Sequence, residues 1–197
     1  MLQPFIVSTN VVALAEIGDK TQLLSLVLAA RYRKPLPIVL GVLVATLVNH
    51  ACAGAVGSWL SDVINPGVLN WVVVGSFVLM AGWILVPDKL DESELAASKR
   101  PMGIFGATVL AFFLAEMGDK TQILTVALAA RYQDLISVVG GTTLGMMLAN
   151  VPAIFLGHRF ADRLPTKAVH IAASAIFLVL GGLALKSAIA GTSASIP

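Results

Sequence analysis

Charged residues are scarce in this sequence, making up 12% of its 197 residues, whereas hydrophobic residues make up 57%. The mean hydropathy is +0.89. A soluble domain needs more polar residues to cover its surface, so this composition excludes one and indicates an integral membrane protein with the lipid bilayer as its surroundings. The formal net charge of +2 is too small to favour a nucleic-acid partner.

Cysteine is almost absent, because Cys52 is the single cysteine of the chain. An intrachain disulfide and a cysteine-rich metal site are therefore excluded. The first residues also lack the basic segment of a cleavable signal peptide, and the apolar stretch that follows is too long for one. We therefore expect the first helix to remain in the mature protein.

Six apolar stretches follow one another along the chain, each long enough to supply the roughly 20 residues that a transmembrane helix needs. They predict an all-α fold of six transmembrane helices at residues 4–30, 36–60, 67–86, 102–130, 135–158 and 168–189. Residues 87–101 hold four acidic and three basic residues and are interpreted as a cytoplasmic linker, with a regulatory role as the alternative.

Lysine and arginine are unevenly divided between the predicted loops. The first, third and fifth loops hold nine of them: Arg31, Arg33, Lys34, Lys89, Lys99, Arg100, Arg159, Arg163 and Lys167. The opposite side holds only Arg131 and, near the end of the last helix, Lys186. Because basic loops stay in the cytoplasm, this distribution predicts that both termini lie outside.

An internal repeat is the strongest pattern in the chain. A shift of 100 residues aligns 15–32 with 115–132, and 13 of these 18 positions are identical. The predicted domains are therefore a first three-helix repeat (1–86), the linker (87–101) and a second three-helix repeat (102–197). Because three helices are an odd number, the second repeat enters the membrane from the other side, and inverted repeats of this kind are typical of secondary transporters.

Each copy of the repeat carries two acids and a lysine near the middle of its first helix. The spacing of Glu16, Asp19 and Lys20 places them on one helical face, as it does their counterparts in the second copy. Ionisable groups at the bilayer centre cost roughly 2.5 to 3.5 kcal/mol each, so they are expected to face inward at a functional site. The predicted metal ligands are Glu16, Asp19, Glu116 and Asp119, with Lys20 and Lys120 as counter-charges.

Four carboxylates and two ammonium groups leave a formal charge of −2, which one divalent cation or two protons would neutralise. Carboxylate oxygens suit calcium, magnesium or manganese. Weaker candidate ligands are Thr21, Gln22, Asn49, Thr121, Gln122 and Asn150. Gly18 and Gly118 allow either local unwinding of the helix or close helix packing. His50 is interpreted either as a proton relay or metal ligand, or as a hydrogen-bonded structural histidine.

The element Glu-hydrophobic-Gly-Asp-Lys-Thr, at Glu16–Thr21 and again at Glu116–Thr121, resembles the signature of the second calcium/cation antiporter family. That family includes bacterial manganese exporters, chloroplast manganese transporters and Golgi manganese/calcium exchangers. The resemblance implies exchange of a divalent cation for protons, the four motif acids as cation ligands, and manganese efflux across the bacterial inner membrane.

The sequence therefore predicts a transporter, not an enzyme, that exchanges Mn²⁺ for protons by alternating access and needs no cofactor beyond its transported ions. A Ca²⁺/proton exchanger of the same architecture is the first alternative. An intramembrane aspartyl hydrolase is a second, because Gly-Asp pairs occur in such proteases, although their Gly-x-Gly-Asp element is absent here. An assembly partner without turnover is a third, and a homo-oligomer is compatible with the sequence.

Overall fold

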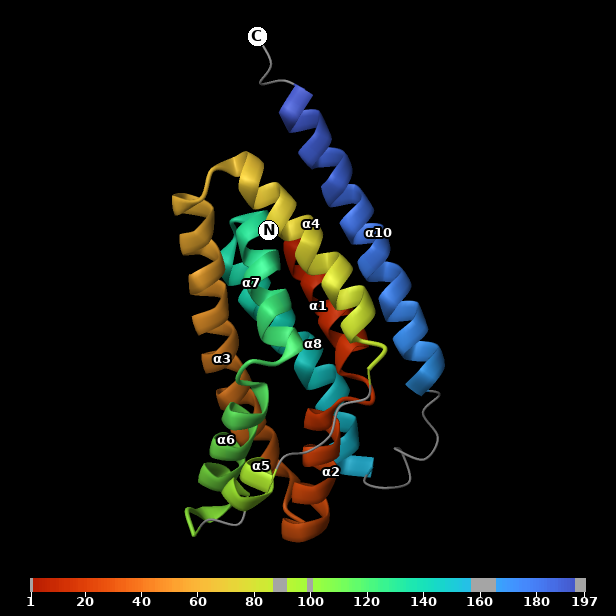
Figure 1. Ribbon diagram of the computed structural model, residues 1–197. Helices are drawn as coiled ribbons and strands as arrows, with labels where there is room; N and C mark the ends of the chain where they lie inside the picture. Colours follow the sequence, from red (N-terminus) through yellow and green to blue (C-terminus); the bar gives the residue numbers. More distant parts are fainter. Residues whose placement is uncertain (1, 87–91, 99–100, 157–165, 194–197) are drawn as a thin grey trace.

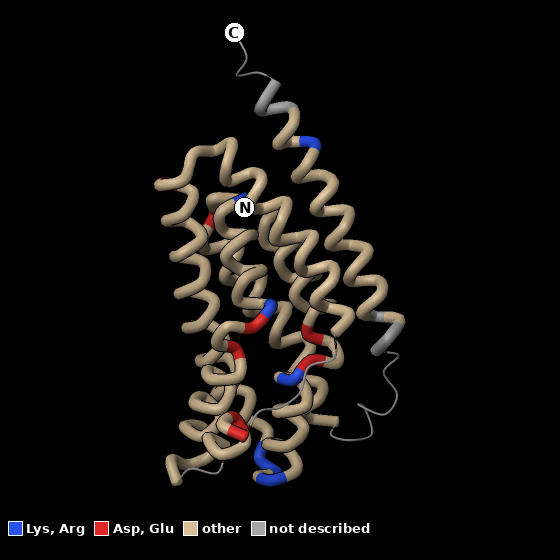
Figure 2. Tube along the Cα trace, in the orientation of Figure 1, with Lys and Arg blue, Asp and Glu red and all other residues tan. Residues whose placement is uncertain are grey.

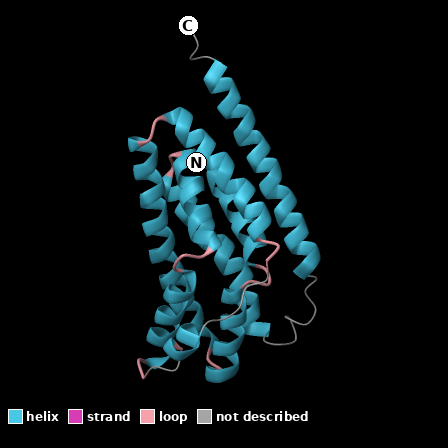
Figure 3. Cartoon of the chain, in the orientation of Figure 1, coloured by secondary structure: helices cyan, strands magenta, loops and turns pink. Residues whose placement is uncertain are grey.

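The computed structural model describes residues 2–86, 92–98, 101–156 and 166–193, and within these ranges the chain is helical with no strand (Figures 1 and 3). The helices are α1 (Leu2–Glu16), α2 (Lys20–Tyr32), α3 (Pro35–Val63), α4 (Pro66–Trp83), α5 (Glu92–Ala97), α6 (Gly103–Glu116), α7 (Lys120–Tyr132), α8 (Leu135–Leu156) and α10 (Thr166–Ser193).

Membrane-spanning helices, as the composition predicts, are present. Within the described ranges, four helical segments are long and apolar enough to cross a bilayer: Pro35–Val63, Pro66–Trp83, Leu135–Leu156 and His170–Ile189. Gly103–Glu116 is a shorter apolar helix. Both α3 and α4 begin at a proline, which is well placed there because the first residues of a helix have no intrahelical partner for their N–H groups.

The prediction of continuous helices at 4–30 and 102–130 is wrong, because each of them is broken in the middle. Gly18 has a φ of 83° and Gly118 a φ of 73°, values in the left-handed region that a right-handed helix cannot contain. The expected single helical face for Glu16, Asp19 and Lys20 is therefore also wrong, since Glu16 ends α1 and Lys20 begins α2. Of the two roles considered for the glycines, local unwinding is the one the structure shows.

Helices of the two sequence repeats pack mainly against each other. The pairs in contact include α1 with α8, α2 with α8, α3 with α6 and α3 with α7. Glycines permit the approach at matching positions: a Cβ added to Gly141 would lie 2.5 Å from the carbonyl oxygen of Phe5, and one added to Gly41 would lie 2.7 Å from the Cβ of Thr108. Side chains larger than hydrogen would therefore push these helices apart.

Two separate hydrophobic clusters hold the bundle together. One joins α1, α4, α7, α8 and α10 and includes Val12, Phe77 and Phe177. The other joins α2, α3, α5, α6 and α8 and includes Leu28 and Phe112. Because α1 and α7 belong to the first cluster and α2 and α6 to the second, the two helix breaks lie between the clusters, where Figure 2 shows acidic and basic residues close together.

The segment interpreted as a linker contains helix α5, which lies beside α6 (Figure 1). Glu94, Ala97 and Ser98 are buried there. Several charged residues of the predicted loops lie outside the described residues: Asp88, Lys89, Asp91, Lys99, Arg100, Arg159, Arg163 and the side chain of Lys167.

Candidate metal site

The repeated motif builds a helix break in which its glycine, its aspartate and the glutamine that follows each have a local role. In the first copy, the Gly18 N–H donates a hydrogen bond to Oε1 of Gln22 over 3.0 Å. In the second copy, the Gly118 N–H donates to Oε1 of Gln122 over 2.8 Å. Asp19 and Asp119 occupy the N-cap positions of α2 and α7 with extended backbone. The motif therefore ends one helix on its glutamate and starts the next after its aspartate.

The two breaks bring three of the four predicted metal ligands together. Carboxylate oxygens of Glu16, Asp19 and Asp119 all lie within 4.8 Å of one another. These side chains are almost completely buried, with exposed fractions of 0%, 1% and 4%. Carboxylate oxygens at this spacing can share a hard divalent cation, because such ions take several oxygen ligands at 2.0 to 2.6 Å.

Glu116 lies outside this group of three, although it is equally buried. Its Oε1 accepts a hydrogen bond of 2.6 Å from the hydroxyl of Thr46 on α3. Glu16 accepts its own hydrogen bond from Thr21 of the same motif, across the break. In each glutamate the second carboxylate oxygen has no hydrogen-bond partner among the described residues. Buried carboxylate oxygens without donors require a cation or a proton, so both glutamates fit an ion-exchange site.

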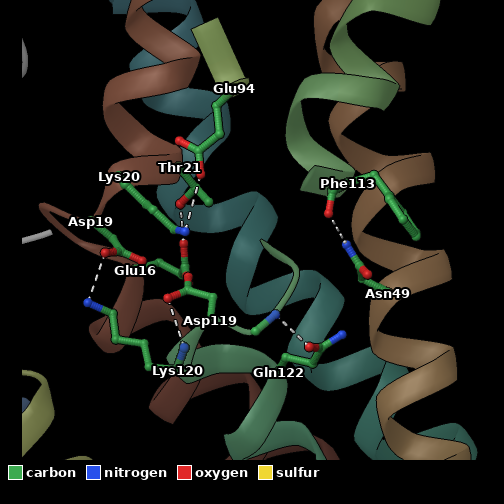
Figure 4. A network of polar contacts seen from close by, with 11 residues as sticks. Glu16, Asp19, Lys20, Thr21, Asn49, Glu94, Phe113, Asp119, Lys120 and Gln122 are labelled. Atoms are coloured by element: carbon green, nitrogen blue, oxygen red, sulfur yellow. Dashed lines mark hydrogen bonds and ion pairs between the residues drawn. The ribbon is translucent and has the colours of Figure 1, made fainter. Parts of the chain in front are cut away.

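The two motif lysines have different partners, although their surroundings in sequence are nearly the same. Nζ of Lys120 lies 2.8 Å from Oδ1 of Asp19, which connects the second motif to the first. Nζ of Lys20 lies 3.3 Å from Oε1 of Glu94 on α5. Figure 4 shows both ammonium groups beside the carboxylate cluster. Both lysines thus form ion pairs with buried carboxylates, and these partners are not the glutamates four residues earlier.

The weaker candidate ligands are near the breaks but take part in packing contacts. Gln22 also donates from Nε2 to the carbonyl oxygen of Ala149 over 3.0 Å. Asn49 donates to the carbonyl oxygen of Phe113 at the end of α6 (Figure 4), and Asn150 accepts from the hydroxyl of Ser25. Gln22 and Asn150 thus connect α2 with α8, and Asn49 connects α3 with α6, whereas the contacts of Thr21 and Gln122 stay within their own breaks. Thr121 is fully buried in α7.

Four polar residues with a role at the breaks were missed by the sequence reasoning. Thr46, Ser25 and Glu94 make the contacts described above, and Nε2 of His170 on α10 lies 2.7 Å from the carbonyl oxygen of Ile17 in the first break. Thr46 lies one turn before Asn49 in an apolar stretch, and this pair of polar residues could have indicated a polar contact inside the membrane. The sequence around Glu94 offers no such signal, because Glu94 is one acid among several in a polar segment.

His50 is buried on α3 with an exposed fraction of 1%, and neither ring nitrogen has a hydrogen-bond partner among the described residues. The structure therefore does not show the hydrogen-bonded structural histidine that was one of its two interpretations.

The arrangement is thus a buried carboxylate cluster between two broken helices, a device by which transporters expose ion-binding groups inside the membrane. The family described as "Divalent cation/proton antiporter GDT1" matches residues 4–92 and 104–192 of the chain, one segment for each repeat. The chain belongs to the GDT1 family. The expected membership of a divalent cation/proton antiporter family is confirmed, as is the prediction of a transporter and not an enzyme.

Proteins similar to this GDT1 family member occur in bacteria and in plants. It is 52% identical over 175 residues to a protein of Vibrio cholerae provisionally named a manganese exporter, covering 88% of this chain and 86% of the relative. It is 29% identical to a GDT1-like protein of Synechocystis, covering 90% and 94%. It is 26% identical to the chloroplastic PAM71-homolog of Arabidopsis thaliana, covering 89% and 57%. No solved structure matches the chain.

Proposed function

We propose that this GDT1 family member exports Mn²⁺ in exchange for protons, through a site built from Glu16, Asp19, Glu116 and Asp119 at the meeting point of the two repeats. The observation that carries the proposal is the convergence of three buried carboxylates from two different repeats within 4.8 Å. Manganese is favoured among hard divalent cations by the provisional name of the Vibrio cholerae relative, which is 52% identical.

The membrane architecture that we propose has six spans in two inverted repeats, 1–86 and 102–197. The broken segments α1–α2 and α6–α7 would each form one span, in addition to α3, α4, α8 and α10. In Figure 1, α1 and α2 run toward the lower end of the bundle, whereas α6 and α7 run toward the upper end. The double match of the family to 4–92 and 104–192 supports the duplication.

The orientation that we propose places the protein in the bacterial inner membrane with both termini outside. Arg31, Arg33 and Lys34 lie at the turn between α2 and α3, and this end of the bundle would face the cytoplasm. Mn²⁺ would enter the carboxylate cluster from that end.

Proton exchange follows from the needs of the same carboxylates. Glu16 and Glu116 each have one oxygen held by a hydroxyl and one without a hydrogen-bond partner among the described residues. When the cation leaves, protons entering from outside would neutralise buried negative charge that is costly without a counter-ion. Rocking of one repeat against the other would then expose the protonated site to the cytoplasm.

The experiment that tests this function is Mn²⁺ flux into proteoliposomes containing the purified full-length protein, with and without a pH gradient. We expect gradient-driven flux in the wild type and its loss in Glu116→Gln and Asp119→Asn, each of which removes one negative charge with little change of shape. Glu92→Gln is the matched control, because Glu92 is an exposed acid outside the site.

Three results would contradict parts of the proposal. Flux of Ca²⁺ without flux of Mn²⁺ would make the protein a calcium exchanger of the same architecture. Mn²⁺ flux that does not depend on the pH gradient would contradict exchange for protons. Full Mn²⁺ flux in both Glu116→Gln and Asp119→Asn would contradict the proposed carboxylate site.

A further inference from the structure

Glu94 is a fifth buried acid at the site, and it belongs to neither copy of the motif. Its exposed fraction is 2%, although the segment around it is polar in sequence. Among carboxylates this degree of burial requires a specific partner. The ammonium of Lys20, the residue directly after Asp19, supplies one at 3.3 Å.

The helix that carries Glu94 is fixed by two further contacts of different kinds. The hydroxyl of Tyr32, at the end of α2, donates to the carbonyl oxygen of Ser98 over 2.6 Å. Ala97 is buried in the same hydrophobic cluster as Leu28 and Phe112. Residues 92–98 are therefore anchored to α2 and α6, the helices on one side of the breaks.

Comparison of the two lysines shows what the contact from Glu94 changes. Lys120 pairs with Asp19, the aspartate of the opposite motif. The repeat would give Lys20 the equivalent partner Asp119, and Lys20 is indeed attracted by Asp119, more strongly than by Glu94. Lys20 also forms an ion pair of 3.3 Å with Glu94, while a carboxylate oxygen of Asp119 lies in the cluster with Glu16 and Asp19. The ammonium of Lys20 is therefore shared between Glu94 and Asp119.

We propose that Glu94 is a positioning residue of the transporter, which draws the ammonium of Lys20 toward α5 and so weakens its pairing with Asp119 in the carboxylate cluster. The role in cation binding rests on the proposed function. An ammonium brought onto Asp119 would compete with the transported cation for the same carboxylate, since both need its negative charge. The segment between the repeats is then part of the ion site and more than a linker.

The first test measures the contact itself and needs no transport. The full-length protein is purified in detergent without divalent cations, and a double-mutant cycle of Lys20→Met and Asp119→Asn is followed by thermal unfolding. The cycle is repeated with Glu94→Gln. We expect a larger stabilising coupling between Lys20 and Asp119 in the Glu94→Gln background, because Lys20 then moves onto Asp119. An unchanged coupling would overturn the proposal.

The second test measures the consequence for the cation, as initial rates of Mn²⁺ flux in proteoliposomes. We expect Glu94→Gln to raise KM for Mn²⁺ about tenfold while kcat changes less than threefold, which is the signature of weakened binding in the ground state. Glu92→Gln, an exposed acid on the same helix, should leave both constants unchanged. With Lys20→Met already present, Glu94→Gln should raise KM no further.

The outcomes separate the two proposals. If the wild type transports no Mn²⁺ but the coupling increases as expected, the proposed function fails and the positioning of Lys20 stands. If Glu94→Gln lowers the melting temperature without changing the coupling or KM, Glu94 is only structural and the inference is wrong. If Glu94→Gln raises KM equally with and without Lys20→Met, Glu94 acts on the cation through another route, and this also overturns it.

Discussion

The two broken segments, 15–32 and 115–132, share 13 of 18 residues and the same local geometry, yet their side chains find different partners. Both copies place a glycine at positive φ, an aspartate at the N-cap and a glutamine side chain on the glycine N–H. Lys120 crosses to Asp19, whereas Lys20 contacts Glu94. Sequence identity over a motif thus fixes the backbone around the site, and the rest of the chain decides how its charges are paired.

The largest expected effect comes from breaking the more deeply buried of the two lysine pairs. Asp19→Asn removes the carboxylate 2.8 Å from Lys120, whose side chain is 2% exposed, and should lower the free energy of unfolding by about 3 to 5 kcal/mol. Lys20→Met should cost less, because its pair is longer, at 3.3 Å, and the Lys20 side chain is 14% exposed. Thermal unfolding in detergent measures both, and equal losses would contradict the asymmetry.

Replacing the break glycines tests the part of the comparison that is symmetric. Gly18→Ala and Gly118→Ala should each destabilise by about 1 to 2 kcal/mol, because a side chain strains a residue at positive φ. Gly75→Ala in α4 is the matched control, since an added Cβ there meets no atom within 4 Å. A loss in only one of the two break variants would show that the breaks differ in the backbone too.

Gln22 and Gln122, whose side chains accept from the break glycines, differ by one hydrogen bond, and their replacement should therefore differ in its cost. Gln22→Leu removes the contact to Gly18 and also the bond to the carbonyl oxygen of Ala149, whereas Gln122→Leu removes the contact to Gly118. We expect Gln22→Leu to cost about 1 kcal/mol more, the typical net value of one hydrogen bond. Chemical or thermal unfolding of the two variants side by side measures the difference, and a larger loss in Gln122→Leu would contradict it.

The smallest effect concerns the turns after α2 and α7. Asp134 precedes α8, and hydrogen bonds from the Ser137 side chain and from the Ser137 N–H, which lies 3.1 Å from Oδ1, lower the pKa of Asp134 below its ordinary value. Lys34 precedes α3 and makes no side-chain cap. A lowered folded-state pKa means that the stabilisation is complete above the ordinary aspartate pKa and is lost as the pH falls through the folded value. Asp134→Ala should therefore lower the melting temperature at neutral pH and have less effect in acid, whereas Lys34→Ala should show no such pH dependence.

Several features of the fold could be predicted from the sequence because they depend on local composition. Apolar runs identified the membrane helices α3, α4, α8 and α10 within a few residues, since burial in lipid requires continuous apolar length. The repeat identified the acids and lysines of the site. The breaks were only one of two alternatives, because a glycine inside an apolar run permits both unwinding and close packing.

The sequence by itself determined the helical membrane fold, the duplication, the motif acids and the family. The tertiary structure alone decided which of them meet: three carboxylates converge, Glu116 takes the hydroxyl of Thr46, and Lys20 takes Glu94. Thr46 and Glu116 lie 70 residues apart in the chain, and Lys20 and Glu94 lie 74 apart, so no local spacing encodes these contacts. They follow from how the helices of one repeat pack against those of the other and against α5, because burial leaves each charged group only the partners that packing brings within reach.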